Sequence, residues 1–330
     1  MKTLITAPIR PRVPTAPGYW RGTKWGVLLL LAFAVTGCSV KRMAVNKLGN
    51  ALAGGGTTFA SDDDPELVKA AVPFSLKLME SLLAESPKHT GLLFATTSGF
   101  TQYGYAFVQQ EADELESQDL AQATALRQRA KRLYVRAHNY GLRGLEARHP
   151  GFTNALAADP RAAVRVMRSA DVPQLYWTAM AWGALISQSK DDPERVAEVP
   201  QMEALIDRAL ELDEGWNFGA VHTFLITYEM ARTGVKGDAA ERSRREFERA
   251  TDQSRGWQAA PLVAYAESVC VQQQDLKQFE SLLARALAID VDAHPDFRLA
   301  NLIHQRRARW LLSKKDELFL IPDPPETKPN

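Results

Sequence analysis

The feature that most constrains this chain is the helical spacing of its apolar residues between residues 62 and 317. Apolar residues recur there at i, i+3, i+4 and i+7, and no segment shows the clear alternation of a strand. Prolines fall at starts or breaks of these segments, where a helix tolerates them. The sequence therefore predicts an all-α domain, with helices near 64–86, 88–117, 119–148, 160–169, 172–189, 194–213, 216–233, 238–254, 257–274, 276–290 and 295–317.

Internal similarity indicates how these helices are arranged. The segments IDRALELD, FERATDQS and LARALAID each contain an Arg-Ala pair, and the pairs begin at Arg208, Arg249 and Arg285. Alanine at a helix crossing lets two helices approach closely, while flanking leucines fill the groove. The spacing is similar to that of tetratricopeptide (TPR) repeats. We therefore expect an array of TPR-like antiparallel helical hairpins, an α-α superhelix, and a generic helical bundle is the alternative.

The first residues of the chain are typical of a lipoprotein leader. Residues 1–25 contain five basic residues and no acid, and the ten residues Gly26–Val35 are apolar and uncharged. A transmembrane helix needs about 20 residues, so this order of segments predicts a signal peptide. The stretch VTGCSV follows the lipobox pattern, in which a small residue and a glycine precede the cysteine, here Cys38. We expect cleavage before Cys38 and acyl chains such as palmitate on it, which bind the bilayer; an uncleaved anchor or a buried core segment is the alternative.

These features divide the chain into four parts. We expect a signal peptide at 1–37, a lipidated tether at 38–61, the TPR-like helical domain at 62–317 and a disordered tail at 318–330, where prolines are frequent. Ser39 rather than an aspartate follows the cysteine, which favours the outer membrane over the inner membrane as the site of anchoring, facing the periplasm.

Composition argues against several classes of function. The leader holds five of the 40 basic residues and no acid, so the mature chain has 35 basic and 39 acidic residues and a net charge near −4. A nucleic-acid binder would have a basic excess. Cys270 is the only cysteine besides Cys38 and lies among apolar residues, which predicts a buried, inert thiol and no intramolecular disulfide. The histidines have no metal-ligand spacing, and no nucleophile motif is present, so we expect no catalytic residue, metal or cofactor.

Aromatic residues gather in three segments. GFTQYGYAFVQQEA also contains two glycines, which predict the close approach of another backbone or a ligand, and DVPQLYWTAMAWGALIS contains an adjacent Tyr-Trp pair that we expect not to face one core together. The third segment is GWNFGAVHTFLITYEMA. Its histidine, His222, stands alone on an apolar face, which predicts a core residue. The candidate ligand or partner surface is formed by Phe100, Tyr103, Tyr105, Tyr176, Trp177 and Trp182. Ordinary core packing is the alternative for each.

The last predicted helix is basic. It carries Arg298, Arg306, Arg307, Arg309, Lys314 and Lys315. A solvated face is the simplest interpretation, and a docking surface for an acidic partner or for lipid head groups is the alternative.

Several of these segments together resemble one known family. The lipobox VTGC, FASDDDPELVKAAVPFSLKLMESLL, GFTQYGYAFVQQEA, DVPQLYWTAMAWGALIS and NLIHQRRARWLLSKKDELF are similar to the T-component (TatT) of tripartite ATP-independent periplasmic (TRAP) transporters. The resemblance implies a lipid-anchored periplasmic protein that docks a periplasmic substrate-binding protein, forms a homo-oligomer, a trimer with a pore, and has no catalytic residue. It leaves the ligand open, with an apolar molecule or an organic anion as the expected class.

Two other functions remain open from the sequence. One is a lipoprotein TPR scaffold for envelope assembly without a transport role, and the other is an enzyme whose site has no readable motif. A neighbouring gene for a substrate-binding protein would argue against the first, and a deep polar pocket with clustered carboxylates or histidines would favour the second.

Overall fold

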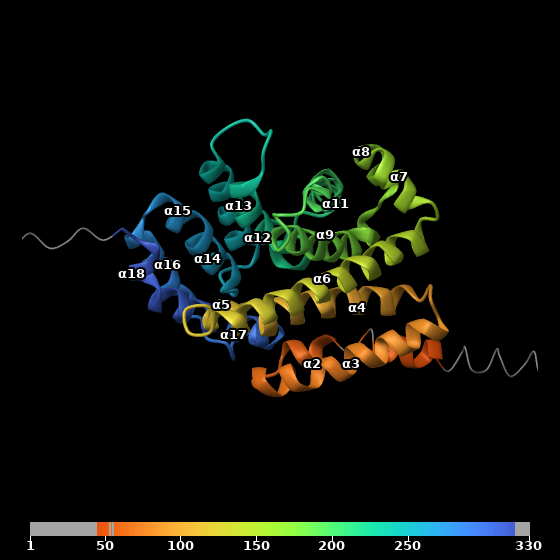
Figure 1. Cartoon of the computed structure of the whole chain (residues 1–330), viewed down its shortest axis with the longest axis horizontal. Helices are drawn as coiled ribbons and strands as arrows, with labels where there is room; N and C mark the ends of the chain where they lie inside the picture. Colours follow the sequence, from red (N-terminus) through yellow and green to blue (C-terminus); the bar gives the residue numbers. More distant parts are fainter. Residues whose placement is uncertain (1–44, 53, 55, 321–330) are drawn as a thin grey trace, which may run out of the picture. The chain divides into compact units, whose positions relative to one another are not determined.

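The computed structural model describes residues 45–52, 54 and 56–320, and Figure 1 shows the chain. All regular elements of these residues are helices, and none of these residues lies in a strand. This confirms the predicted all-α class. Within the described ranges, no helix is both long enough and apolar enough to cross a bilayer.

The helices follow the predicted order, and most boundaries agree within a few residues. They are α2 (Gly56–Ala60), α3 (Pro65–Glu85), α4 (Thr90–Tyr103), α5 (Gln110–Leu115), α6 (Leu120–Arg148), α7 (Phe152–Ala158), α8 (Pro160–Ala163), α9 (Val172–Ser187), α10 (Pro193–Val196), α11 (Val199–Leu212), α12 (Trp216–Ala231), α13 (Ala239–Gln253), α14 (Ala260–Tyr265), α15 (Val271–Gln273), α16 (Leu276–Leu287), α17 (Arg298–Ser313) and α18 (Lys315–Leu318). Two π-helical segments, η1 (Gly104–Gln109) and η4 (Ala266–Cys270), join α4 to α5 and α14 to α15.

The start of α3 is set by local chemistry that the sequence displays. The carboxylate of Asp64 accepts hydrogen bonds from the backbone N–H groups of Glu66 and Leu67, and Pro65 occupies the first helical position. The helix packs on α4, which in turn packs on α6.

Glycines in the first helices allow side chains of neighbouring helices to pack closely on the backbone. The sequence predicted another backbone or a ligand at Gly99 and Gly104, and the structure instead places a side chain against each. A Cβ on Gly99 would lie 2.8 Å from Leu76 of α3, and a Cβ on Gly104 would lie 2.9 Å from the ring of Tyr134 on α6. Both glycines are therefore explained by contacts within this chain.

The Arg-Ala pairs of the sequence repeats fall where helices meet. Ala209 of α11, Ala250 of α13 and Ala286 of α16 are fully buried. Consecutive helices pack in series over this region, with α12 on α13, α13 on α14, α14 on α16, and α16 on α17. Burial of all three alanines agrees with the role that the sequence assigned to them.

The N-terminal part of α12 contains a left-handed turn. Asn217, Phe218 and Gly219 have φ angles of 48°, 58° and 80° in succession. Residues other than glycine rarely adopt this left-handed backbone conformation, and it normally occurs at a single residue rather than at three in succession. The turn follows Trp216, whose ring lies 4.9 Å from that of Tyr176 on α9.

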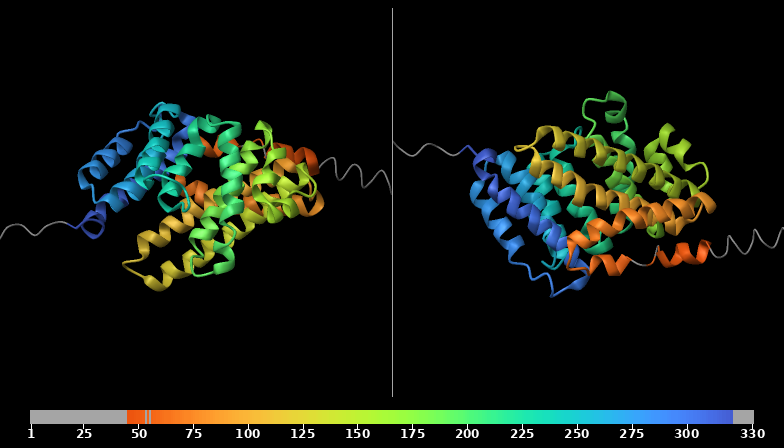
Figure 2. Two further views of the ribbon diagram at one scale, coloured as in Figure 1. Left: turned by 90° about the horizontal axis from the view of Figure 1, so that it is seen from above. Right: turned by 60° about the horizontal axis from the view of Figure 1, so that its bottom comes forward.

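The last long helix returns to the first ones. Figure 2 shows α17, in blue, beside the orange N-terminal helices, and α17 contacts both α2 and α3. Leu299 and Ile303 of α17 pack against the apolar cluster of the N-terminal helices. The guanidinium group of Arg306 lies 2.5 Å from the carboxylate of Glu114 on α5. Residues 192 positions apart in the sequence are therefore in direct contact.

The structure differs from the sequence prediction at three places. The predicted helix at 160–169 is reduced to α8 and short 3-10 turns, and α7 lies before it, where no helix was predicted. Part of the predicted tether is helical, at 45–52 and in α2, and Asn46 accepts a hydrogen bond from Ser86 at the end of α3. Residues 318–320, which the sequence assigned to the tail, are part of the described fold, and Phe319 is buried against Phe279. The predicted signal peptide at 1–37, the predicted lipidation site Cys38 and residues 321–330 lie outside the described residues.

Candidate functional site: a buried polar junction

The six aromatic residues that the sequence singles out do not lie together. Phe100 and Tyr103 belong to the apolar cluster of the N-terminal helices, whereas Tyr176 and Trp182 belong to the cluster around α9 and α11. All four are buried, with at most 7% of each exposed. Trp177 and Tyr105 are only partly buried. A ligand or partner role for the six stays a prediction, and the two partly buried residues are its most accessible members.

The adjacent Tyr176 and Trp177 correct one sequence argument. We expected that they could not both face the same core, but both pack against the cluster around α9, with ring centroids 5.1 Å apart. Both side chains reach one cluster, in which Tyr176 also contacts Trp216.

Trp182 belongs to a small buried polar group formed with His138 and Glu198. Its indole N–H donates to Glu198, and the ring of His138 packs on it at 4.3 Å. Burial lowers the pKa of His138 to about 4, with the nearby Glu198 opposing and Arg195 reinforcing this shift. The histidine is therefore neutral at pH 7.

Tyr105 lies in a polar junction built from three distant segments. It stands on η1, Glu267 stands on η4, and Arg307 comes from α17. The guanidinium group of Arg307 contacts Glu267 at 2.5 Å and Asp113 of α5 at 3.0 Å, and it lies 4.2 Å from the ring of Trp310. π-helical segments occur frequently at functional sites, and this junction joins two of them.

Arg307 is buried, although the sequence did not predict this. We expected the basic residues of α17 to form a solvated face, but Arg307 is only 7% exposed and is paired with two carboxylates. The signal was present in the spacing. Arg307 lies four residues from Ile303 and four from Leu311, so it occupies the apolar stripe of its helix.

Several polar atoms at the junction have no hydrogen-bond partner. Gln110 is fully buried, and neither its amide nitrogen nor its amide oxygen is hydrogen-bonded, although the side chain lies close enough to Tyr105 to lower the pKa of that phenol. Nδ1 of His304 and Nε1 of Trp310 are also buried without a partner. A buried polar group without a partner costs about 1–3 kcal/mol. The junction therefore suits a small polar molecule, either water or a ligand, that pairs with these atoms.

Both titratable rings of the junction are held in their neutral forms. Burial, with a smaller contribution from the charge of Glu267, raises the pKa of Tyr105 to about 12. Burial, reinforced by the positive charge of Arg307, lowers the pKa of His304 to about 4. The rings lie 6.2 Å apart. At pH 7 the neutral rings of Tyr105 and His304 therefore lie near Arg307, whose charge is balanced by Glu267 and Asp113.

The junction has no arrangement for metal binding. In the part of the chain that the structure describes, no group of three or more His, Cys, Asp or Glu side chains could hold a metal ion. Two further residues, Cys270 and His222, are buried as the sequence predicted. Cys270 is a buried free thiol whose pKa burial raises to about 12, and His222 is buried and hydrogen-bonded to Glu246 at 2.6 Å.

Comparison with known proteins assigns the family. The family model described as TRAP transporter T-component matches residues 61–319. The chain belongs to the TRAP transporter T-component family. An uncharacterized protein of Treponema pallidum (strain Nichols) is similar to it, with 29% identity over 302 residues that cover 86% of this chain and 94% of that protein.

The family match contains every part of the polar junction. Both π-helical segments and α17 lie within residues 61–319. The family is that of a transporter component, as the resemblance implied, and all residues of the junction lie within the matched range.

Proposed function

We propose that this protein is a lipid-anchored periplasmic component of a TRAP-type transporter that docks the periplasmic substrate-binding protein of that transporter. The observation that carries the proposal is the T-component family match over nearly all of the described residues. The anchor would be the acylated Cys38, with the outer membrane favoured by Ser39. Anchoring raises the local concentration of a partner at the membrane, so the role we propose is positional and requires no catalysis.

We further propose that the helices form a TPR-like superhelical array that presents a binding surface. Support comes from the buried alanines of the three Arg-Ala pairs and from the serial packing of α12 to α17. Such arrays hold proteins or small ligands on their surfaces. Trp177 and Tyr105 are the members of the predicted aromatic set that we propose to contact an apolar or organic-anion ligand, because each keeps some accessible surface.

A homo-oligomer is the other assembly that we propose, and α3 offers a surface for it. Leu67 and Phe74 of this helix are 59% and 74% exposed, and Ala71 lies between them on the same face. Exposed apolar stripes of this kind mark interaction sites.

The test is a pull-down from chemically crosslinked cell envelopes that contain the tagged full-length protein, with partners identified by mass spectrometry. We expect a periplasmic substrate-binding protein as the dominant partner. Cys38→Ala should reduce capture because it removes the anchor, whereas an exposed control substitution, Arg165→Gln, should not. Capture of peptidoglycan or outer-membrane assembly proteins instead would replace the transporter role by that of an envelope scaffold.

A further inference from the structure

The exposed face of α6 is a stripe of arginines. Five side chains of this helix between residues 129 and 143 are exposed, and they are Arg129, Arg132, Arg136, Asn139 and Arg143. Their spacing of three or four residues places them on one side of the helix. Over its whole length α6 has seven basic residues and one acid, although the predicted mature chain is acidic. We call the four exposed arginines the arginine stripe.

Aromatic rings hold most of the arginine stripe in place. Three guanidinium groups lie over ring centroids, Arg129 over Tyr103 at 5.8 Å, Arg136 over Phe100 at 5.8 Å and Arg143 over Tyr140 at 5.0 Å. Stacking on a ring uses one face of the planar guanidinium group and does not cover its N–H groups, which donate within that plane. Donors arranged in this way suit the oxygen atoms of a phosphate group.

Acids do not balance the charge of the arginine stripe. Among the described residues, Arg136 is the only member that forms an ion pair, with Glu80 at 3.3 Å, and Glu80 also contacts Lys77 at 2.6 Å. The other acids near the stripe are Glu85 at the end of α3 and Glu146 near the end of α6. Positive charge therefore remains in excess on this surface.

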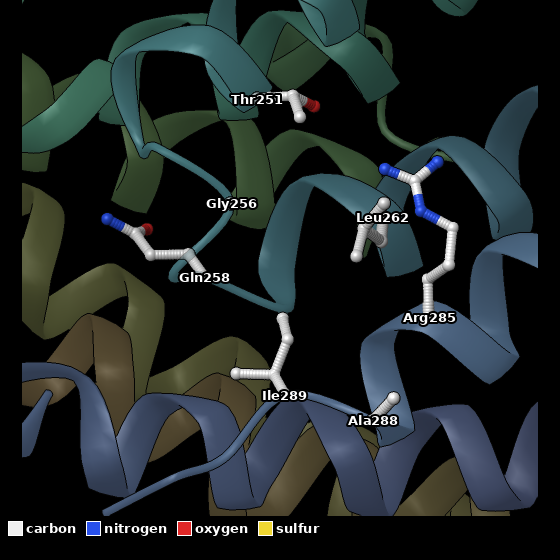
Figure 3. A pocket seen from close by; sticks show the side chains of 7 residues that line it. All are labelled: Thr251, Gly256, Gln258, Leu262, Arg285, Ala288 and Ile289. Atoms are coloured by element: carbon white, nitrogen blue, oxygen red, sulfur yellow. The ribbon is translucent and has the colours of Figure 1, made fainter. Parts of the chain in front are cut away.

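Basic residues at two other sites of the fold have acidic neighbours. Arg306 and Arg307 of α17 are both paired with carboxylates. Arg285 is the cation beside the surface hollow of about 250 Å³ between α13, α14 and α16 (Figure 3), and it lines an adjoining hollow together with Asp275. Charge is compensated locally at these sites, whereas at the arginine stripe it is not.

One end of the arginine stripe lies where the chain enters the described fold. Asn46 accepts a hydrogen bond from Ser86 in the loop between α3 and α4, and its backbone oxygen lies 3.3 Å from Nε2 of His89. Arg143 donates to the backbone oxygen of Pro87 in the same loop. Figure 1 shows the first described helix, in orange-red, beside the end of α3. The entry point and the stripe therefore adjoin each other.

The predicted lipid anchor is close to this entry point along the chain. Cys38 precedes residue 46 by eight residues, which span at most about 28 Å when fully extended. Acyl chains on Cys38 therefore keep this end of the fold near the head groups of the bilayer. The connecting residues include Lys41 and Arg42 and no acid, and Lys47 and Lys88 add two exposed cations at the entry point.

We propose that the arginine stripe, together with Lys47 and Lys88, docks on anionic phospholipid head groups of the bilayer that holds the anchor. Clusters of basic residues beside a membrane attachment bind anionic lipids, and an acyl anchor combined with a basic patch attaches more stably than either alone. Docking of this face sets the orientation of the fold on the membrane, which the anchor alone does not. The inference rests on the lipid anchor of the proposed function, but not on its transporter partner.

Lysine labelling of the mature lipoprotein on vesicles tests this docking. The protein is inserted into preformed vesicles of phosphatidylcholine, or of an equimolar mixture of phosphatidylcholine and phosphatidylglycerol, and an uncharged amine reagent is added. We expect Lys47 and Lys88 to react at least about threefold more slowly on the mixed vesicles, and this protection to disappear in high salt. Lys236, exposed in the loop between α12 and α13, should react equally on both.

A variant that combines Arg132→Gln, Arg136→Gln and Arg143→Gln should lose the protection of Lys88 while its circular dichroism is unchanged. Arg132→Gln alone, which breaks no ion pair or hydrogen bond of the described residues, should lose part of it. The matched control lowers the net charge equally by replacing exposed arginines of α13 and α16 with glutamine, at Arg245, Arg249 and Arg285. This control should keep the protection.

Equal labelling of Lys88 on both kinds of vesicle, or protection that the triple variant keeps, would overturn the inference. Protection that appears only after a periplasmic substrate-binding protein is added would also overturn it, and would assign the arginine stripe to that partner. Flotation with the neutral vesicles reports the anchor alone. Protein that does not float with them would refute the anchor and this inference with it, whereas floating protein with an unprotected Lys88 would refute the docking only.

Discussion

Gly141 and Gly144 lie on the face of α6 on which α9 packs, and they show how much single residues decide here. A Cβ on Gly141 would lie 2.6 Å from the hydroxyl oxygen of Thr178, and a Cβ on Gly144 would lie 2.7 Å from the side chain of Gln174. Thr178 is fully buried and cannot move away into solvent. The separation between α6 and α9 therefore depends on these positions having no side chain.

Gly141→Ala should lower the free energy of unfolding by about 1–3 kcal/mol, the usual cost of overpacking a core. Gly183→Ala on α9 is the matched control, because a Cβ there meets its nearest atom, on Phe224, at 3.4 Å. That variant should be neutral or gain up to about 1 kcal/mol from better helix propensity. Urea unfolding followed by circular dichroism measures both, and equal effects of the two substitutions would contradict the packing argument.

Buried neutral histidines make the fold sensitive to acid. Burial lowers the pKa of both His138 and His304 to about 4 from the ordinary value near 6.5. The unfolded chain therefore binds more protons than the folded chain between these values, so stability is complete above pH 6.5 and falls as the pH drops toward 4. Each histidine contributes up to about 3 kcal/mol to this loss.

His138→Gln should flatten the dependence of the unfolding free energy on pH between about 6.5 and 4, because glutamine does not titrate there. The double variant with His304→Gln should be flatter still. The measurement is urea unfolding at several pH values over this interval. A slope that stays at the wild-type value in the double variant would show that other groups, not these two histidines, cause the acid sensitivity.

At the scale of elements, the outer face of α3 is the clearest unexplained surface. Phe74 is 74% exposed and Leu67 is 59% exposed, whereas the opposite face of the same helix buries Leu76 and Leu83. A helix apolar on two sides is stable when both sides are covered. Phe74→Glu should shift the protein in detergent toward the monomer in sedimentation velocity, while its helical content is unchanged.

Leu120→Glu is the control for α3, because Leu120 is 63% exposed at the start of α6 and lies outside the stripe. It should leave the sedimentation profile as in the wild type. If Phe74→Glu sediments as the wild type but loses the substrate-binding protein in the crosslinking experiment, the stripe binds that partner and not a second copy.

A helix could be predicted from the sequence where its ends carry capping residues or prolines. The start of α3 was readable because Asp64 and Pro65 form a standard helix start. The helix α7 was missed because it begins after Gly151, whose φ of 88° is left-handed, without any side-chain cap. The π-helical segments have no sequence signature of their own, so Tyr105 could be nominated but its environment could not.

At the scale of the whole molecule, α17 is joined to α5 and to the N-terminal helices by residues far apart in the sequence. Arg306 pairs with Glu114 and Arg307 pairs with Asp113, over separations of 192 and 194 residues. Leu299 and Ile303 add apolar contacts. No local sequence pattern predicts a pairing over such a distance. The sequence therefore indicated the helices and their apolar faces, but not that α17 contacts α5.

Arg306→Glu should weaken this contact, because it places two acids where an ion pair of 2.5 Å exists. Hydrogen exchange should become faster in α5 and α17, and remain unchanged in α9 and α11, whose packing lies elsewhere. Glu114→Arg combined with Arg306→Glu restores opposite charges and should slow the exchange again. Arg306 is partly accessible, so each step should be modest and should shrink in high salt. If the double variant exchanges as fast as Arg306→Glu alone, the Arg306–Glu114 pair does not stabilise this contact, and the remaining contacts, those of Leu299, Ile303 and Arg307, hold α17 in place.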